Sequence, residues 1–173
     1  MNKSTQNIMK GIAAGLFASW VKSLVEPPLQ RWGEKKYPPT AEELQLKGAD
    51  VSNHPENMPP AILAEQVYHE CTGSELTDEQ KITAMKGIHY ALGTVIGITY
   101  VSLVNRNRNL KIEQGITAGV VTWALTHGST VPALGLQGKV SEMPKSWWVW
   151  EFGSHIVFGV VLEQSRKLVN KFF

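Results

Sequence analysis

The sequence has little that would indicate soluble catalysis or nucleic-acid binding. Cys71 is the one cysteine in 173 residues, so an internal disulfide is excluded, and no C-x-x-C pair suggests redox or zinc-finger chemistry. The net charge is +2 and the basic residues are scattered, which leaves no electrostatic footprint for nucleic acid. No nucleophile elbow, phosphate-binding loop or dinucleotide fingerprint occurs. The sequence therefore disfavours an enzyme and leaves that alternative open.

Four long apolar segments dominate what is present. Each has about 18 to 20 apolar-rich residues, enough to cross the hydrocarbon core of a bilayer. Pro27 and Pro28 are expected to end the first, a capping box at Thr77 to Gln80 to open the second, and Pro132 to close the third. We predict an all-α, four-helix transmembrane bundle forming a single membrane domain over residues 1–173, with helices at about 8–25, 77–104, 112–130 and 147–167.

Residues 27–76, between the first two segments, are polar and rich in proline. They are predicted to form an outer connector that carries one short amphipathic helix, from Ala61 to Cys71, closed by Gly73. The first apolar segment has no small-residue cleavage site after it, so we expect it to be retained as a helix. The mean hydropathy of −0.14 is low for a membrane protein because this connector dilutes it.

The alternative is a soluble four-helix bundle, which the charged residues inside the segments would suit. Three features favour lipid: aromatic residues gather near the segment ends, small residues recur at a spacing of four, and the charged residues fit one membrane topology. Interior glycine weakens a helix in water by about 1 kcal/mol, whereas in lipid it permits close helix contact. These glycine faces are also predicted to pack against a second copy of the chain or a larger membrane complex: Gly11/Gly15, Gly93/Gly97 and Gly115/Gly119.

The basic residues predict a topology. Arg106, Arg108 and Lys111 lie in the short turn between the second and third segments, which the positive-inside rule places in the cytoplasm. Both termini are then cytoplasmic and the connector lies outside. Glu163, with Arg166 and Lys167 three and four residues later, is expected to form an ion-paired helix turn on the cytoplasmic side.

This topology brings ionisable residues from all four helices to the outer half of the membrane. Polar groups in a bilayer are costly and usually face partners or a wet cavity. The convergent set is predicted as a site for protons or a ligand: Lys22, Glu26, His89, His127, Glu151 and His155. Glu151 and His155 are four residues apart and so share a helix face.

Two chemistries suit this set. Imidazole and carboxylate groups are ligands for a divalent metal such as zinc, which would use His89, His127, Glu151 and His155. The same groups can relay or sense protons, because histidine titrates near neutral pH. Each histidine can also be an ordinary hydrogen-bonded side chain near a helix end, and Lys22 and Glu26 can be a simple intrahelical ion pair.

The same residues carry a resemblance to a known family. The sequence resembles the YagU family of bacterial inner-membrane proteins, which share a domain of unknown function. The matching stretches cover all four predicted helices: G-x₅-V-K-x₃-E-x-P at Gly15 to Pro28, I-H-Y-A around His89, Q-G-x-x-A-G at Gln114 to Gly119, H-x₄-P-x-x-G-L at His127 to Leu136, and E-F-G-S-H with E-x-x-R at Glu151 to Arg166.

The resemblance implies a multi-pass protein of the inner membrane, linked in the best-known member to survival in acid. It implies no biochemical activity. The recurring polar positions of the family correspond to Lys22, Glu26, His89, His127, Glu151, His155 and Glu163. The leading hypothesis is therefore an outward-facing His/Glu site for proton sensing or metal binding. The alternative is a structural or accessory subunit of a membrane complex in which the cluster only locks the helices together.

Overall fold

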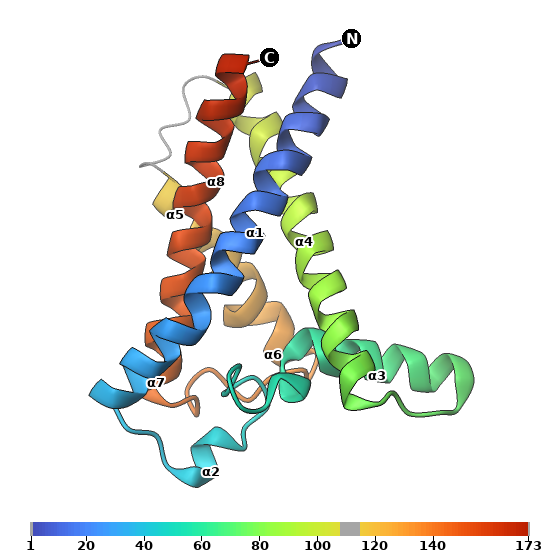
Figure 1. The fold of residues 1–173 in the computed structure, drawn as a ribbon, viewed down its shortest axis with the longest axis vertical. Helices are drawn as coiled ribbons and strands as arrows, with labels where there is room; N and C mark the ends of the chain where they lie inside the picture. Colours follow the sequence, from blue (N-terminus) through green and yellow to red (C-terminus); the bar gives the residue numbers. More distant parts are fainter. Residues whose placement is uncertain (1, 108–114, 173) are drawn as a thin grey trace. The chain divides into compact units, whose positions relative to one another are not determined.

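The computed structural model describes residues 2–107 and 115–172, and within these ranges the chain is helical and contains no strand (Figure 1). The predictions for Arg108, Lys111, Gln114 and the start of the third apolar segment concern residues outside the described ranges. The elements are α1 Lys3–Lys36, α2 Ala41–Leu44, η1 Pro55–Asn57, α3 Pro59–Thr72, α4 Asp78–Arg106, α5 Ile116–Leu125, η3 Thr126–Thr130, α6 Val131–Ala133, α7 Lys145–Trp147, η4 Trp148–Phe152 and α8 Gly153–Phe172.

The chain forms two compact units, each built from separate stretches of sequence. The first unit comprises Met1–Val25, Tyr90–Trp123 and Ser154–Phe173. The second unit comprises Glu26–His89 and Ala124–Gly153, and so contains most of the predicted connector. That the whole chain is one membrane domain stays a prediction.

The prediction that Pro27 and Pro28 end the first helix is wrong, because α1 continues through both to Lys36. Proline fixes φ near −65°, which suits a helix, and its cost comes from the lost N–H donor and a clash with the preceding turn. Packing beyond the prolines offsets that cost. Gln30 is fully buried there, and a Cβ on Gly33 would already lie 3.1 Å from the carbonyl oxygen of Ser146.

The remainder of the predicted connector contains α2, η1 and α3, so more of it is helical than the sequence predicted. A capping box at Thr40 begins α2, and α3 is capped after Thr72 by Gly73, whose φ of 71° places it in the left-handed region. The predicted capping box that precedes α4 is confirmed: Thr77 N–H donates to Gln80 Oε1 at 2.9 Å, and Gln80 N–H donates to Thr77 Oγ1 at 3.3 Å.

A turn at residues 50–53, of which Asp50 is buried, is bound to α1 through Gln30. Gln30 Nε2 donates to Asp50 Oδ1 at 2.6 Å, while Gln30 Oε1 accepts the backbone N–H groups of Val51 and Ser52 at 3.2 and 3.1 Å. The backbone N–H of Asn53 also donates to Asp50 Oδ1. Burial raises the pKa of the Asp50 carboxyl group, but the hydrogen bonds that it accepts outweigh burial and hold the pKa below its usual value.

In the first unit, α1 and α4 approach closely at four glycines. A Cβ on Gly11 would overlap the backbone of Ile98, and a Cβ on Gly97 would lie 2.7 Å from the Cα of Gly15. A Cβ on Gly93 would collide with the side chain of Ser19. These small residues therefore let the two backbones touch, as in membrane helix pairs.

A second close contact in the same unit joins α5 to α8. A Cβ on Gly119 would lie 2.9 Å from the carbonyl carbon of His155, and a Cβ on Gly159 would lie 2.8 Å from the Cα of Gly119. Gly115 has a φ of 97°, a conformation that other residues rarely adopt. All three predicted glycine faces are thus used for packing inside the chain. Their use by a partner chain stays a prediction.

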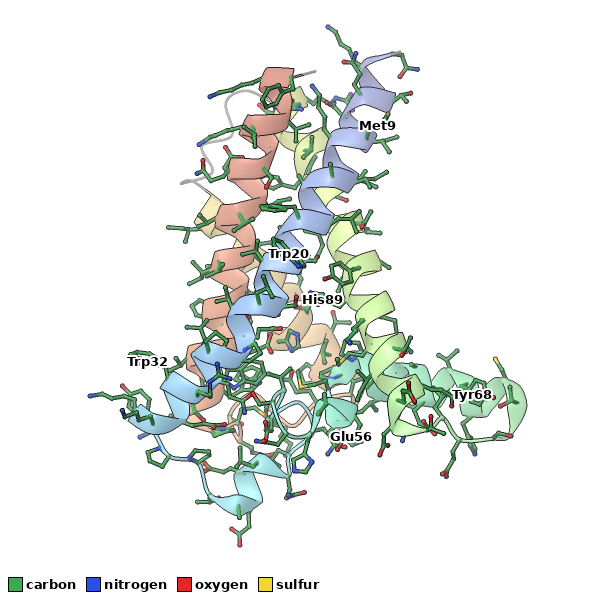
Figure 2. All side chains as sticks on the ribbon, viewed as in Figure 1. Met9, Trp20, Trp32, Glu56, Tyr68 and His89 are labelled. Carbon is green, nitrogen blue, oxygen red and sulfur yellow. The ribbon has the colours of Figure 1, made fainter. Side chains whose placement is uncertain are left out.

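The faces of α1 are reversed relative to a helix of a water-soluble protein. Its buried side carries small and polar residues, including Ala14, Ala18 and Lys22, while large apolar side chains point outward. Figure 2 labels Met9, Trp20 and Trp32 along this helix, with exposed fractions of 51%, 48% and 59%. Among the described helices, α1 and α4 are long and apolar enough to cross a membrane. The four-helix transmembrane bundle stays a prediction.

Glu163 forms the predicted helix pairs at the C-terminal end of α8. Arg166 donates to both of its carboxylate oxygens, at 2.7 and 2.8 Å, and Lys167 Nζ lies 3.5 Å away. The hydroxyl group of Tyr100 on α4 donates to Glu163 Oε2 at 2.9 Å, a contact between helices that the sequence did not indicate.

Candidate functional site

Two of the predicted site residues lie on π-helical turns of the second unit. His127 is in η3, which continues α5 into α6, and Glu151 is in η4, which continues α7 into α8. A π-turn inserts one residue into a helix and rotates the side chains that follow, and such turns are frequent at functional sites. The predicted helix at 147–167 is present within a longer helical run, 145–172, and the described part of the helix predicted at 112–130 is a run over 116–133. Each of these runs contains a π-turn.

Pro132 explains how the turn at His127 is completed. The N–H of Val131 bonds to the carbonyl oxygen of Thr126, five residues earlier, and the same pattern would join residue 132 to the carbonyl of His127. Proline has no N–H to donate. The side chain of Gln137 takes this place, because its Nε2 donates to the carbonyl oxygen of His127 at 3.3 Å.

This bond to the backbone fixes the orientation of Gln137 and, through it, the tautomer of His127. With Nε2 of Gln137 on the carbonyl, its Oε1 faces His127 Nδ1 at 2.6 Å. An amide oxygen only accepts, so Nδ1 of His127 carries a proton and donates it. In the neutral imidazole the lone pair then lies on Nε2.

His127 Nε2 faces the carboxylate of Glu151, with 3.4 Å between Nε2 and Oε1. The side chain of Glu151 is 1% exposed and that of His127 is 14% exposed. The indole ring of Trp147 packs edge-on against the imidazole, with 6.4 Å between the ring centres. The pair is therefore largely removed from solvent. In such a buried place an isolated carboxylate would be costly.

The loop at Lys47–Gly48, part of the predicted connector, contacts the residues next to this pair. The carbonyl oxygen of Gly48 accepts a hydrogen bond from Trp147 Nε1 at 3.1 Å, and the N–H of Gly138 donates to the carbonyl oxygen of Lys47 at 3.1 Å. Gly48 has a φ of 80°, and a Cβ there would lie 3.1 Å from Gln137 Cγ. The loop at Lys47–Gly48 thus contacts Gln137 and Trp147, the two residues that flank the imidazole of His127.

The other predicted site residues occupy several elements. Lys22 and Glu26 are buried on α1, four residues apart. His89 is half-buried on α4, and His155 is buried on α8, four residues after Glu151. The structure brings His127 and Glu151 together; that Lys22, Glu26, His89 and His155 share a site with this pair stays a prediction.

Sequence reasoning missed Gln137, Trp147 and Gly48 as parts of the site. Gln137 directly follows the stretch from His127 to Leu136 that carried the family resemblance, and Pro132 stands five residues after His127. A proline at that spacing leaves the histidine carbonyl without its helical donor. This was the signal that could have indicated a nearby side-chain donor.

Over residues 2–107 and 115–172 these features define a helical protein without strands, with two helices long and apolar enough to span a membrane and a buried histidine–glutamate pair. The family described as "Protein of unknown function (DUF1440)" matches residues 16–164, and the chain belongs to this family. The prediction of a domain of unknown function is therefore confirmed. No curated protein and no solved structure matches the sequence.

Proposed function

We propose that this protein is a multi-pass protein of the bacterial inner membrane that binds a divalent metal, zinc foremost, at His127, Glu151 and His155. The observation that carries the proposal is the fixed imidazole of His127, whose Nδ1 is bound to Gln137 while Nε2 faces Glu151. Histidines that ligate metals almost always donate their other ring N–H to an acceptor in this way, which orients the ring and fixes the tautomer.

The spacing of the two donor atoms suits zinc. In a tetrahedral site with bonds of about 2.0 to 2.1 Å, two ligand atoms lie about 3.3 Å apart. His127 Nε2 and Glu151 Oε1 are 3.4 Å apart, which is longer than an ordinary N–H···O hydrogen bond. A cation between them would also neutralise the buried carboxylate.

His155 is the proposed third ligand. It follows Glu151 by one helical turn, and it is 5% exposed. His127, Glu151 and His155 are a group of the residue types that can hold a metal ion. Two histidines and one carboxylate, with a water in the fourth position, are a known zinc ligand set.

The membrane location rests on the reversed faces of α1 and on the lengths of α1 and α4. We extend it to four spans by including the helical runs α5–η3–α6 and α7–η4–α8, with both termini cytoplasmic as the basic residues predict. The resemblance to the YagU family supports the inner membrane and a link to acid stress. Under this topology the metal site faces outward.

The test is zinc binding by the purified protein in detergent. Wild type should bind one zinc per chain, and zinc at about 100 times its dissociation constant should stabilise the fold by about 2.7 kcal/mol. His127→Gln and His155→Gln should each weaken binding by at least about tenfold, as loss of a metal ligand or its orienting partner does. His69→Gln, which removes an exposed histidine of α3, is the matched control and should bind as wild type does.

Two other outcomes identify the alternatives. A fold whose stability ignores zinc but changes between about pH 5 and 8, the range in which histidine titrates, would replace metal binding by proton sensing. The nearly complete burial of Glu151 favours the second alternative, a structural lock. A lock requires that His127→Gln and His155→Gln lose stability in the absence of zinc, with no zinc response in wild type.

A further inference from the structure

A second polar cluster, separate from the His127–Glu151 pair, joins three helices of the first unit. Asn105 of α4 lies at its centre: its Oδ1 accepts from Arg166 Nη1 and from Asn170 Nδ2, each at 3.0 Å, and its Nδ2 donates to Asn7 Oδ1 at 3.0 Å. Lys10 of α1 completes the cluster, because its Nζ donates to Asn170 Oδ1 at 3.0 Å.

The charges in this cluster do not balance. The carboxylate of Glu163 is bound on both oxygens by Arg166, which accounts for one positive and one negative charge. Lys10 is 9% exposed, and its partner among the described residues is a neutral amide. A buried ammonium group without an opposite charge is costly. Counted over the described residues, the cluster therefore has one buried positive charge in surplus.

The surroundings add to the surplus. The start of α1 and the ends of α4 and α8 lie at the same end of the first unit (Figure 1), which the bonds between Asn7, Asn105 and Asn170 confirm. In the described residues 2–10, 100–107 and 163–172, Glu163 is the one acidic residue. The basic residues in these ranges are Lys3, Lys10, Arg106, Arg166, Lys167 and Lys171.

We propose that Lys10, held in place by Asn170, binds a phosphate group that is supplied by the headgroup of an anionic phospholipid. Lys10 Nζ has three N–H donors and, among the residues that the structure describes, uses one on Asn170, which leaves two for phosphate oxygens. Basic pockets between membrane helices bind anionic headgroups in this way on the cytoplasmic side. The site is independent of the metal site, since it shares no residue with it.

The experiment measures retention of phosphatidylglycerol against phosphatidylcholine by the full-length protein in nanodiscs containing both lipids, at roughly 0.15 M salt to screen exposed charges. Wild type should retain phosphatidylglycerol preferentially. Lys10→Met should lower this preference by at least about tenfold, the factor expected for a charge-assisted hydrogen bond. Lys3→Met, which removes an exposed lysine of the same helix, is the matched control and should keep the preference.

A second variant protects the test against a folding defect. Asn170→Asp supplies a carboxylate to Lys10 from inside the protein, so it should also abolish the preference while the helical content is unchanged. Lys10→Arg should retain it. Inorganic phosphate is the third arm: competition by millimolar phosphate would show that the source is a soluble phosphate rather than a lipid. Equal lipid preference in wild type, Lys10→Met and Asn170→Asp would overturn the proposal.

Discussion

The contact between α1 and α4 gives a prediction with an internal control on one helix. Gly97 and Gly87 both lie within α4, but a Cβ on Gly97 would be 2.7 Å from Gly15 Cα and 2.8 Å from Gly15 N, whereas a Cβ on Gly87 would meet nothing within 4 Å. Ordinary carbon contacts are about 3.5 to 4.0 Å, so Gly97→Ala requires the backbones to separate by roughly 1 Å.

The two alanine variants should therefore change stability differently. Alanine favours a helix over glycine by about 1 kcal/mol at either site. At Gly97 this gain is opposed by overpacking, which costs roughly 1 to 3 kcal/mol, and no side-chain rotation can relieve a clash with backbone. We expect Gly97→Ala to be less stable than Gly87→Ala by about 1 to 3 kcal/mol.

The measurement is reversible unfolding in mixed micelles, with a rising fraction of a denaturing detergent and helix content followed by circular dichroism. Gly87→Ala should unfold at the wild-type midpoint or above it, and Gly97→Ala below it. If both variants unfold at the same midpoint, the backbones of α1 and α4 are not in contact at Gly97 and the described packing is wrong.

Three further predictions concern other parts of the chain. The pKa of Asp50 is lowered by folding, so its contribution to stability is present above the unfolded pKa of about 3.8 and is lost as the pH falls through the lower folded value. Asp50→Asn should therefore lose stability at pH 7 and show a smaller further loss of stability on acidification. A variant whose stability responds to acid as wild type does would refute this role. Tyr100→Phe removes one hydrogen bond to Glu163 and should cost about 1 to 3 kcal/mol of stability. Glu163→Gln also removes the negative charge that pairs with Arg166, and should cost about 3 to 5 kcal/mol. Unfolding midpoints in the reverse order would contradict the described network. Gly48→Ala places a side chain at a φ of 80° and should cost about 1 to 2 kcal/mol and weaken zinc binding, which a variant with wild-type affinity would disprove.

Local sequence signals predicted most of the helical structure. The apolar segments mark α4, and the capping box at Thr77 fixes its first turn within one residue. Charge spacing along one helix also predicted the pairing of Glu163 with Arg166 and Lys167. Each of these features depends on residues within about one helical turn, where spacing determines contact.

Features that depend on distant residues could not be predicted in this way. The helix passes Pro27 and Pro28 because Gln30 binds the turn at residues 50–53, and no local pattern reports that contact. The two π-turns change the direction of side chains without an obvious sequence mark. Composition indicated that the connector is polar, but not that part of it contacts the site. Its Lys47–Gly48 loop does so through two single hydrogen bonds to its backbone carbonyl oxygens.

The candidate site was only partly predictable, because residue types are visible in the sequence and contacts between distant residues are not. His127 and Glu151 were singled out as residue types that are costly in a membrane, which needs no knowledge of contacts. Their pairing and the role of Gln137 depend on how the turn before Pro132 closes. The sequence therefore singled out both residues but not the geometry of their contact.

The central claim is best tested by the metal content of the protein, purified without chelators from cells and measured by elemental analysis. We predict close to one zinc per chain in wild type and in His69→Gln, and a loss of that zinc in His127→Gln. Protein that contains no divalent metal as purified, and that takes up none when zinc is added, would contradict the account and leave the His127–Glu151 pair without a metal-binding role.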